Sequence, residues 1–115
     1  MNKIKELLHK HLSEDAITVC ELSEKSNDFV WLEKQGYYNR KTGKETEKGK
    51  AYTKKHDDLM GFHFGRIKDN SLDVENLNKL RNELNKYTSK NSVNIYEGLT
   101  EAESFAYRYI VHGRW

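Results

Sequence analysis

The sequence predicts an α+β fold in which capped helices alternate with short strands. Three observations favour it. Residues 3–13 and 73–90 repeat apolar side chains at helical spacing. Residues 37–46 combine two tyrosines with a Thr42-Gly43 turn signal, which is typical of a β-hairpin. Residues 59–67 alternate aromatic with small or polar side chains, which indicates a strand with one aromatic face.

Length and composition indicate one folded domain. The chain has 115 residues, within the usual domain size of about 100–150 residues. It is polar, with 36% hydrophobic and 33% charged residues, but its two Trp, seven Tyr and four Phe residues argue against disorder. We expect a single compact domain, with a helix-and-hairpin segment at 1–68 and an extension at 69–115 packed on it.

Cysteine content and hydropathy predict a cytoplasmic protein. The one cysteine, Cys20, excludes an intramolecular disulfide and any zinc site with several cysteines. No window approaches about 18 consecutive apolar residues, and the N-terminus lacks the apolar segment of a secretory signal. We therefore expect a reduced protein that does not contact a membrane.

Three helices are predicted in the first part of the chain. The first covers residues 3–13. Thr18 and Glu21 form a predicted capping box for a second helix that ends at about residue 25. Asn27 and Asp28 are predicted to cap a third helix of about ten residues, and Gly36 suits the left-handed residue at its end.

A basic hairpin is predicted to follow the third helix. Its strands flank Thr42-Gly43, and the return strand covers only residues 44–46. Thr46 is predicted to cap a short turn that places Ala51 and Tyr52 inward. The aromatic strand at 59–67 comes next.

The last third is predicted to be helix-strand-helix. Residues 73–90 carry a narrow apolar stripe, which either packs within the domain or forms a homodimer with a second copy; we favour packing within the domain. Residues 92–97 alternate as a short strand. Thr100 and Glu103 form a second capping box, which begins the final helix.

Basic residues cluster around the predicted hairpin. Between positions 34 and 55 there are eight Lys or Arg residues and two acidic residues, whereas the net charge of the whole chain is +2. A clustered patch can follow a phosphate backbone through counterion release even when net charge is small. A solvated, lysine-rich surface is the alternative interpretation.

Three segments of the first half resemble a known family. They read Thr18-Val19-Cys20-Glu21-Leu22, then Trp31-Leu32-Glu33-Lys34-Gln35-Gly36-Tyr37, then Thr46-Glu47-Lys48-Gly49-Lys50-Ala51-Tyr52. They resemble the winged helix-turn-helix of prokaryotic regulators, and most closely the C-terminal domain of phage antirepressors of the KilA-C type. The resemblance covers about half the chain, and it implies a winged-helix fold for residues 1–68 and a DNA-binding regulator encoded by a phage or mobile element.

The DNA-binding hypothesis assigns the candidate residues to two elements. Asn27, Lys34 and Gln35 are the candidates in the third helix, although Asn27 also fits a helix cap. The hairpin and the turn after it supply basic residues for phosphate or minor-groove contacts: Arg40, Lys41, Lys44, Lys48 and Lys50. Asp28 departs from the pattern, because a carboxylate at the start of a recognition helix repels phosphate unless it accepts a hydrogen bond from cytosine.

A protein-binding inhibitor is the alternative hypothesis. Such a protein, an antirepressor or an anti-defence protein of the anti-CRISPR kind, would act on a host nucleic-acid-binding protein. The short third helix, Asp28 and the last third of the chain motivate it. Tyr109 and Trp115 would then contact the partner, although Trp115 also fits packing against its own domain.

The sequence contains no motif that indicates an enzyme. It lacks a phosphate-binding glycine loop and a Ser-His-Asp order. The five histidines (His9, His11, His56, His63 and His112) show no zinc-ligand spacing. Nothing around Cys20 marks a nucleophile. We therefore expect no catalytic residues, no metal and no cofactor.

Overall fold

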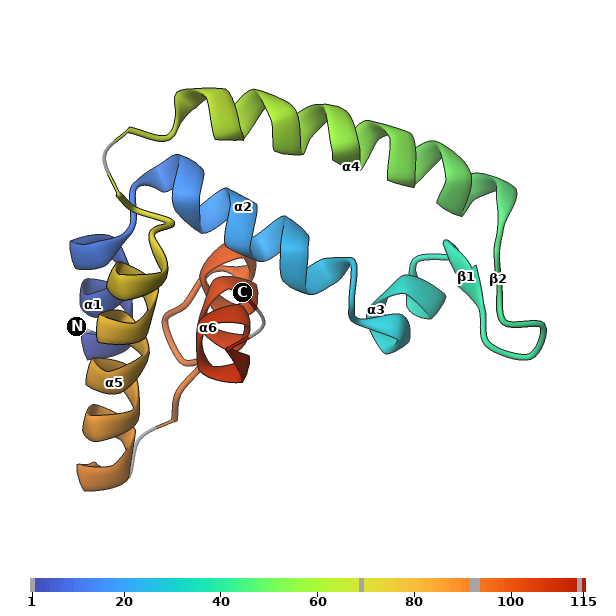
Figure 1. Cartoon of the computed structure of the whole chain (residues 1–115). Coiled ribbons are helices and arrows are strands. Elements are labelled where there is room, and N and C mark those ends of the chain that lie inside the picture. Colours follow the sequence, from blue (N-terminus) through green and yellow to red (C-terminus); the bar gives the residue numbers. More distant parts are fainter. Residues whose placement is uncertain (1, 69, 92–93, 114) are drawn as a thin grey trace.

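A computed structural model describes residues 2–68, 70–91, 94–113 and 115, and in this part of the chain helices dominate (Figure 1). One antiparallel hairpin is the only sheet in these ranges. In order, the elements are α1 (Lys3–His11), α2 (Glu14–Lys25), α3 (Phe29–Lys34), β1 (Tyr38–Asn39), β2 (Lys44–Glu45), α4 (Glu47–Arg66), α5 (Val74–Lys90) and α6 (Glu101–His112).

The predicted α+β class is wrong, because residues 59–66 are helical. Thr46 does cap the next element, accepting a hydrogen bond from the Gly49 amide at 3.0 Å, but this element is the 20-residue helix α4. Met60 and His63 are partly buried at helical spacing, whereas Phe62 is exposed. The alternation of aromatic residues therefore belongs to a helix that buries one face. The described residues form a mainly α fold and do not show a winged helix.

The predicted C-terminal strand is also wrong where it can be judged. Residues 92 and 93 of that segment lie outside the described residues. Residues 94–97 form a turn, in which the Glu97 amide donates to the Asn94 carbonyl at 3.3 Å. In the described part of the extension, α5 and α6 are therefore separated by a turn and not by a strand.

Helix α2 begins earlier than predicted. Ser13 is its N-cap and accepts a hydrogen bond from the Ala16 amide at 3.1 Å. Thr18 lies one turn inside the helix, and its hydroxyl donates to the Glu14 carbonyl. The caps at Asp28 and Thr100 are confirmed, but α3 has six residues instead of about ten.

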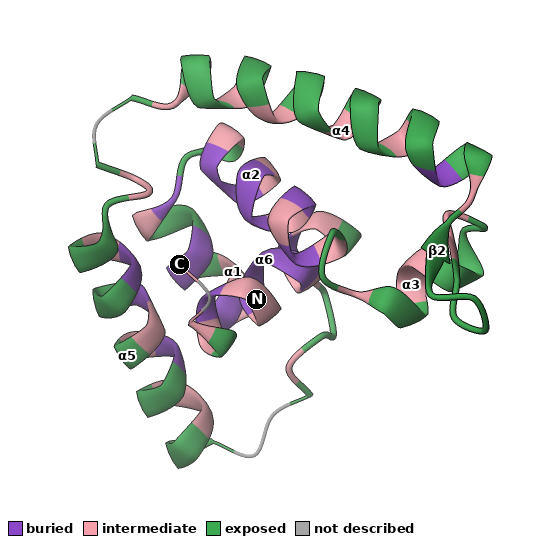
Figure 2. Ribbon diagram, turned by 45° about the vertical axis from the view of Figure 1, so that its right-hand side comes forward, coloured by how far each residue is buried: buried purple, intermediate pink, exposed green. Residues whose placement is uncertain are grey.

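The core lies between α1, α2, α5 and α6, so both segments of the chain contribute to it (Figure 2). Leu77, Leu80 and Leu84 of α5 are buried there. The apolar stripe at 73–90 thus packs inside the chain, and Val74, at 55% exposure, is its one strongly exposed member. This leaves little apolar surface on α5 for the homodimer considered above.

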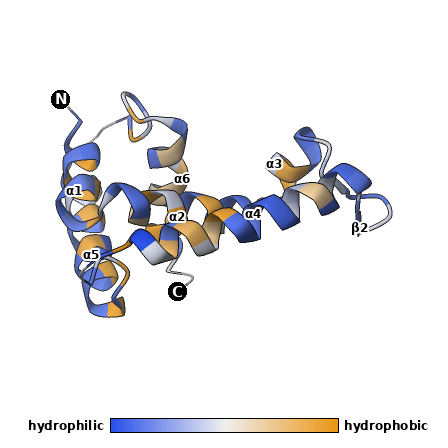
Figure 3. Cartoon of the chain, turned by 90° about the horizontal axis from the view of Figure 1, so that it is seen from above, coloured by the Kyte–Doolittle hydropathy of each residue, from blue (hydrophilic) through white to orange (hydrophobic). Residues whose placement is uncertain are grey.

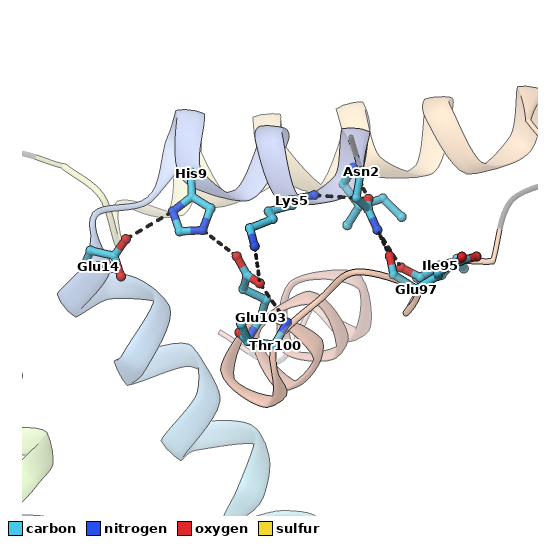
Figure 4. A network of polar contacts seen from close by, with 9 residues as sticks. Asn2, Lys5, His9, Glu14, Ile95, Glu97, Thr100 and Glu103 are labelled. Carbon is cyan, nitrogen blue, oxygen red and sulfur yellow. Dashed lines mark hydrogen bonds and ion pairs between the residues drawn. The ribbon is translucent and has the colours of Figure 1, made fainter.

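Polar contacts fasten α1 to α6 across this core (Figure 4). His9 Nε2 lies 2.6 Å from Glu103 Oε2, and Lys5 Nζ lies 3.6 Å from Glu103 Oε1. Glu103 also completes the predicted capping box by accepting from the Thr100 amide at 2.8 Å. One buried carboxylate therefore both caps α6 and joins it to α1.

Helix α4 lies along α2, and it carries a projecting arm at its N-terminal end (Figure 1). We define the arm as residues 28–57: α3, the hairpin and the first half of α4. His56 and His63 join α4 to α2, with His56 Nε2 2.8 Å from the Leu22 carbonyl and His63 Nδ1 2.7 Å from Asp15. None of the described helices is both long and apolar enough to span a bilayer.

Candidate nucleic-acid interface

The hairpin forms where the sequence predicts it. Tyr38 pairs with Glu45, and Asn39 with Lys44. The Asn39 side chain accepts from the Lys41 amide at 2.9 Å, which tightens the turn, and Gly43 takes the left-handed φ of 69°. Arg40 and Lys41 are thereby held at the tip.

The cations at the tip are available to a ligand. Arg40, Lys41 and Lys44 are all exposed. None of them makes an ion pair with another described residue. An anion that binds here therefore does not have to displace an internal carboxylate from them.

The start of α4 extends this positive surface. Lys48, Lys50, Lys54 and Lys55 are exposed there. Lys50 Nζ lies 3.4 Å from Glu47 Oε1, and the Lys48 ammonium lies 5.4 Å from the centre of the Tyr37 ring. A helix N-terminus already carries a partial positive charge, so lysines in its first turn raise the local potential at some cost in stability. This placement favours an anionic ligand.

Aromatic packing holds the arm together. Tyr37 and Tyr52 stack with ring centres 4.3 Å apart, and Trp31 lies 5.9 Å from each of them. Gly49 is buried against the hairpin, where an added Cβ would lie 1.9 Å from the Tyr37 carbonyl oxygen. The Thr46 hydroxyl donates to the Gly36 carbonyl at 2.6 Å. The hairpin is thus fixed directly on the start of α4.

Asp28 has a structural role in this arm. Its Oδ1 accepts from the Trp31 amide at 3.0 Å, and its Oδ2 lies 3.4 Å from Nη1 of Arg108 in α6. The side chain is only 20% exposed. The carboxylate is therefore directed into the protein and partly neutralised, which removes the objection that it would repel phosphate.

The candidates assigned to the third helix lie in different settings. The Asn27 side chain donates to the Ser23 carbonyl at 3.0 Å, so it helps to end α2. Lys34 and Gln35 are exposed at the end of α3. A helix of six residues spans only about 9 Å, which is short for reading the major groove. The geometry supports backbone contacts by the arm more than base reading by α3.

The two partner candidates lie on the core. Tyr109 and Trp115 are partly buried against it, with ring centres 6.0 Å apart. Burial raises the pKa of the Tyr109 hydroxyl, and a hydrogen bond with Ser23 opposes this shift. A contact of these residues with another protein stays a prediction.

The exposed apolar side chains on α4 were not predicted. Leu59, Phe62 and Phe64 are 37%, 56% and 53% exposed in the second half of this helix. The helical spacing of Tyr52, His56 and Met60 could have revealed them, because these residues define the face towards α2 and leave the phenylalanines outside.

Each of the five histidines lies within hydrogen-bond distance of an oxygen atom on another helix. His9, His11, His63 and His112 lie close to carboxylates on other helices, and His56 contacts a backbone carbonyl of α2. Among the described residues, no group of three or more His, Cys, Asp and Glu side chains is placed to hold a metal ion.

Comparison with protein-family models, with curated proteins and with solved structures finds no match for this chain.

Proposed function

We propose that this protein binds nucleic acid through the basic arm, as a regulator of the phage or mobile-element kind that acts in the cytoplasm. The observation that carries the proposal is the set of three exposed cations at the hairpin tip, Arg40, Lys41 and Lys44, which make no ion pair with a described residue. Contacts to phosphate set affinity and orientation, and each releases a counterion.

The arm supports such contacts in two ways. The tip projects beyond the core, so a duplex can approach it without meeting α1 or α5 (Figure 1). Lys48 and Lys50 add positive charge at the start of α4, next to the tip in the chain. A ligand that follows the hairpin onto α4 therefore meets positive charge along its path.

Charge reversal at the tip tests the proposal. The triple variant Arg40→Glu/Lys41→Glu/Lys44→Glu is compared with wild type by fluorescence anisotropy on a labelled duplex of random sequence at about 50 mM salt. The matched control reverses three exposed lysines of α5 (Lys79→Glu/Lys86→Glu/Lys90→Glu), which gives the same change in net charge. The proposal expects binding that only the tip variant loses. Equal weakening by both variants would mean that net charge alone is responsible.

A second candidate is the protein-binding inhibitor, and one observation favours it. Leu59 and Phe62, three positions apart, leave apolar surface exposed on one side of α4, and Phe64 is exposed on another side. Exposed apolar surface often marks a contact with another protein. Affinity purification from host cells with wild type, the tip variant and a Phe62→Ser/Phe64→Ser variant would distinguish the two. A host nucleic-acid-binding protein retained by the first two and lost by the third would support the inhibitor.

A further inference from the structure

A pocket opens inside the arm, between α3, the hairpin and α4. Its volume is about 400 Å³, within the range of about 300–1,000 Å³ that small-ligand sites occupy. Phe29, Tyr38 and Tyr52 contribute aromatic walls, and Glu45 and Asp57 contribute carboxylates. We call it the aromatic pocket.

Phe29 gives this pocket an accessible aromatic surface. Its side chain is 53% exposed, and its ring lies 5.0 Å from that of Tyr38 at an angle of 42°. Figure 3 shows hydrophobic residues in α3 beside a mainly hydrophilic hairpin. A flat aromatic ligand can therefore cover apolar surface here that the protein leaves in water.

The polar groups of the pocket favour a ligand that donates hydrogen bonds. None of the described residues that line it is Lys or Arg, although seven Lys and one Arg lie between positions 34 and 55. Asp57 is 76% exposed, and Glu45 accepts from the Thr53 hydroxyl at 2.6 Å. Carboxylates accept hydrogen bonds from amino groups and repel phosphate, so an anionic group does not fit inside.

The pocket is continuous with the basic tip. Tyr38 and Glu45 are a register pair on its wall, and the next pair, Asn39 and Lys44, leads into the tip. Arg40 follows Tyr38 by two residues, a span of about 7 Å along a strand. A single nucleotide can bridge such a span, with its base on one side and its phosphate on the other.

We propose that the aromatic pocket takes an unpaired nucleobase that carries an exocyclic amine, adenine or cytosine, while the neighbouring phosphates lie on the hairpin tip. The base stacks on Phe29, and its amino group donates to Asp57, the pairing that acidic side chains make with cytosine N4, because Glu45 already accepts from Thr53. A base stacked in a duplex is not accessible to the pocket, so single strands are the preferred ligand. This inference rests on the proposed nucleic-acid binding.

The test uses labelled single strands of about 12 nucleotides, oligo-dC and oligo-dT, and a duplex of the same length. Phe29→Ala is compared with Val30→Ala, its neighbour on α3, which is 54% exposed and does not line the pocket. Asp57→Ala is compared with Asp58→Ala, which is also exposed and outside the pocket. Thermal unfolding of each variant confirms that it is folded.

We expect oligo-dC to bind more tightly than oligo-dT or the duplex. Phe29→Ala should weaken oligo-dC binding about tenfold, in line with the loss of one stacked base, and should leave duplex binding unchanged. Asp57→Ala should remove the preference for dC over dT, because only cytosine has an amino group that can donate a hydrogen bond to Asp57.

Two results would overturn the inference, and they can be told apart. If Phe29→Ala behaves like Val30→Ala while the tip variant still loses binding, no base enters the pocket, and backbone binding stands. If wild type binds neither strands nor duplex at low salt, the inference and the proposed function both fail.

Discussion

Oδ2 of Asp28, the N-cap residue of α3, lies 3.4 Å from Arg108 Nη1 in α6, and this ion pair joins the basic arm to the helical core. The Arg108 guanidinium also lies over the Phe105 ring, 4.2 Å from its centre. Asp28 caps α3 at the same time. One side chain therefore both begins α3 and fixes the arm on the core.

Replacing Asp28 should separate these two roles. Asp28→Ala removes cap and ion pair, and we expect it to lower the free energy of unfolding by about 1–2 kcal/mol. Asp28→Asn keeps a capping oxygen, and because Arg108 is one-third exposed the lost pair should cost less than about 1 kcal/mol. Urea unfolding measures both. Equal losses in the two variants would mean that the cap contributes nothing.

Two glycines of α4 should respond to alanine with opposite signs. At Gly49 the new Cβ would meet the Tyr37 carbonyl, so Gly49→Ala should destabilise the attachment of the hairpin by about 1–3 kcal/mol or more. At Gly61 a Cβ meets nothing within 4 Å, so Gly61→Ala should stabilise the helix by up to about 1 kcal/mol. Thermal unfolding and amide exchange in residues 37–52 provide the readout. A tolerated Gly49→Ala would contradict the close contact.

Stability should fall in acid because two carboxylates have lowered pKa values in the folded protein. A hydrogen bond with His11 lowers the pKa of Glu83. Burial acts to raise the pKa of Glu103, but hydrogen bonds from Thr100 and His9 outweigh it and lower this pKa. A lowered pKa stabilises the fold above the unfolded value of about 4.3, and this contribution disappears as pH falls through the folded value.

Urea unfolding between about pH 7 and pH 3 checks this expectation. Glu83→Gln should flatten the decline below about pH 4.5, whereas Glu33→Gln, at an exposed position of α3, should leave it unchanged. A wild-type protein equally stable at both ends of the range would refute the assignment.

Cys20 should be unreactive in the folded protein. It is fully buried, and burial raises the pKa of its thiol to about 12. Because the thiolate is the reactive form, alkylation at neutral pH should proceed only through unfolding. Leu84→Ala, which opens a cavity in the core and should cost about 2–5 kcal/mol, should therefore accelerate it strongly. Fast labelling of the folded wild type would contradict the buried position.

The helices of the core could be predicted because their apolar spacing and caps agree. In α5, Leu77, Leu80 and Leu84 mark one face, and the Thr100 capping box marks the start of α6. The hairpin could also be predicted, because Thr42-Gly43 favours a turn and Gly43 can adopt the left-handed conformation that this turn needs. In these places local chemistry and burial favour the same structure.

The long helix α4 could not be predicted by the alternation at 59–67. A run of aromatic and small residues at period two satisfies a strand pattern, but contacts of His56 and His63 with α2 fix this segment as a helix. The cap at Asp28 was predicted, but its ion pair was missed for a similar reason, because its partner Arg108 is 80 positions away in the sequence. Long-range partners of this kind are not visible in a local motif.

The salt dependence of binding tests the central claim most directly. Anisotropy titrations of a random-sequence duplex between about 50 and 200 mM salt give the slope of log affinity against log salt. We predict that wild type binds the duplex with a negative slope. In Arg40→Glu/Lys41→Glu/Lys44→Glu this slope should become less steep by about one unit for each reversed cation that contacts a phosphate in wild type. A slope that is the same in wild type and variant, or no binding at the lowest salt, would contradict nucleic-acid binding by the arm.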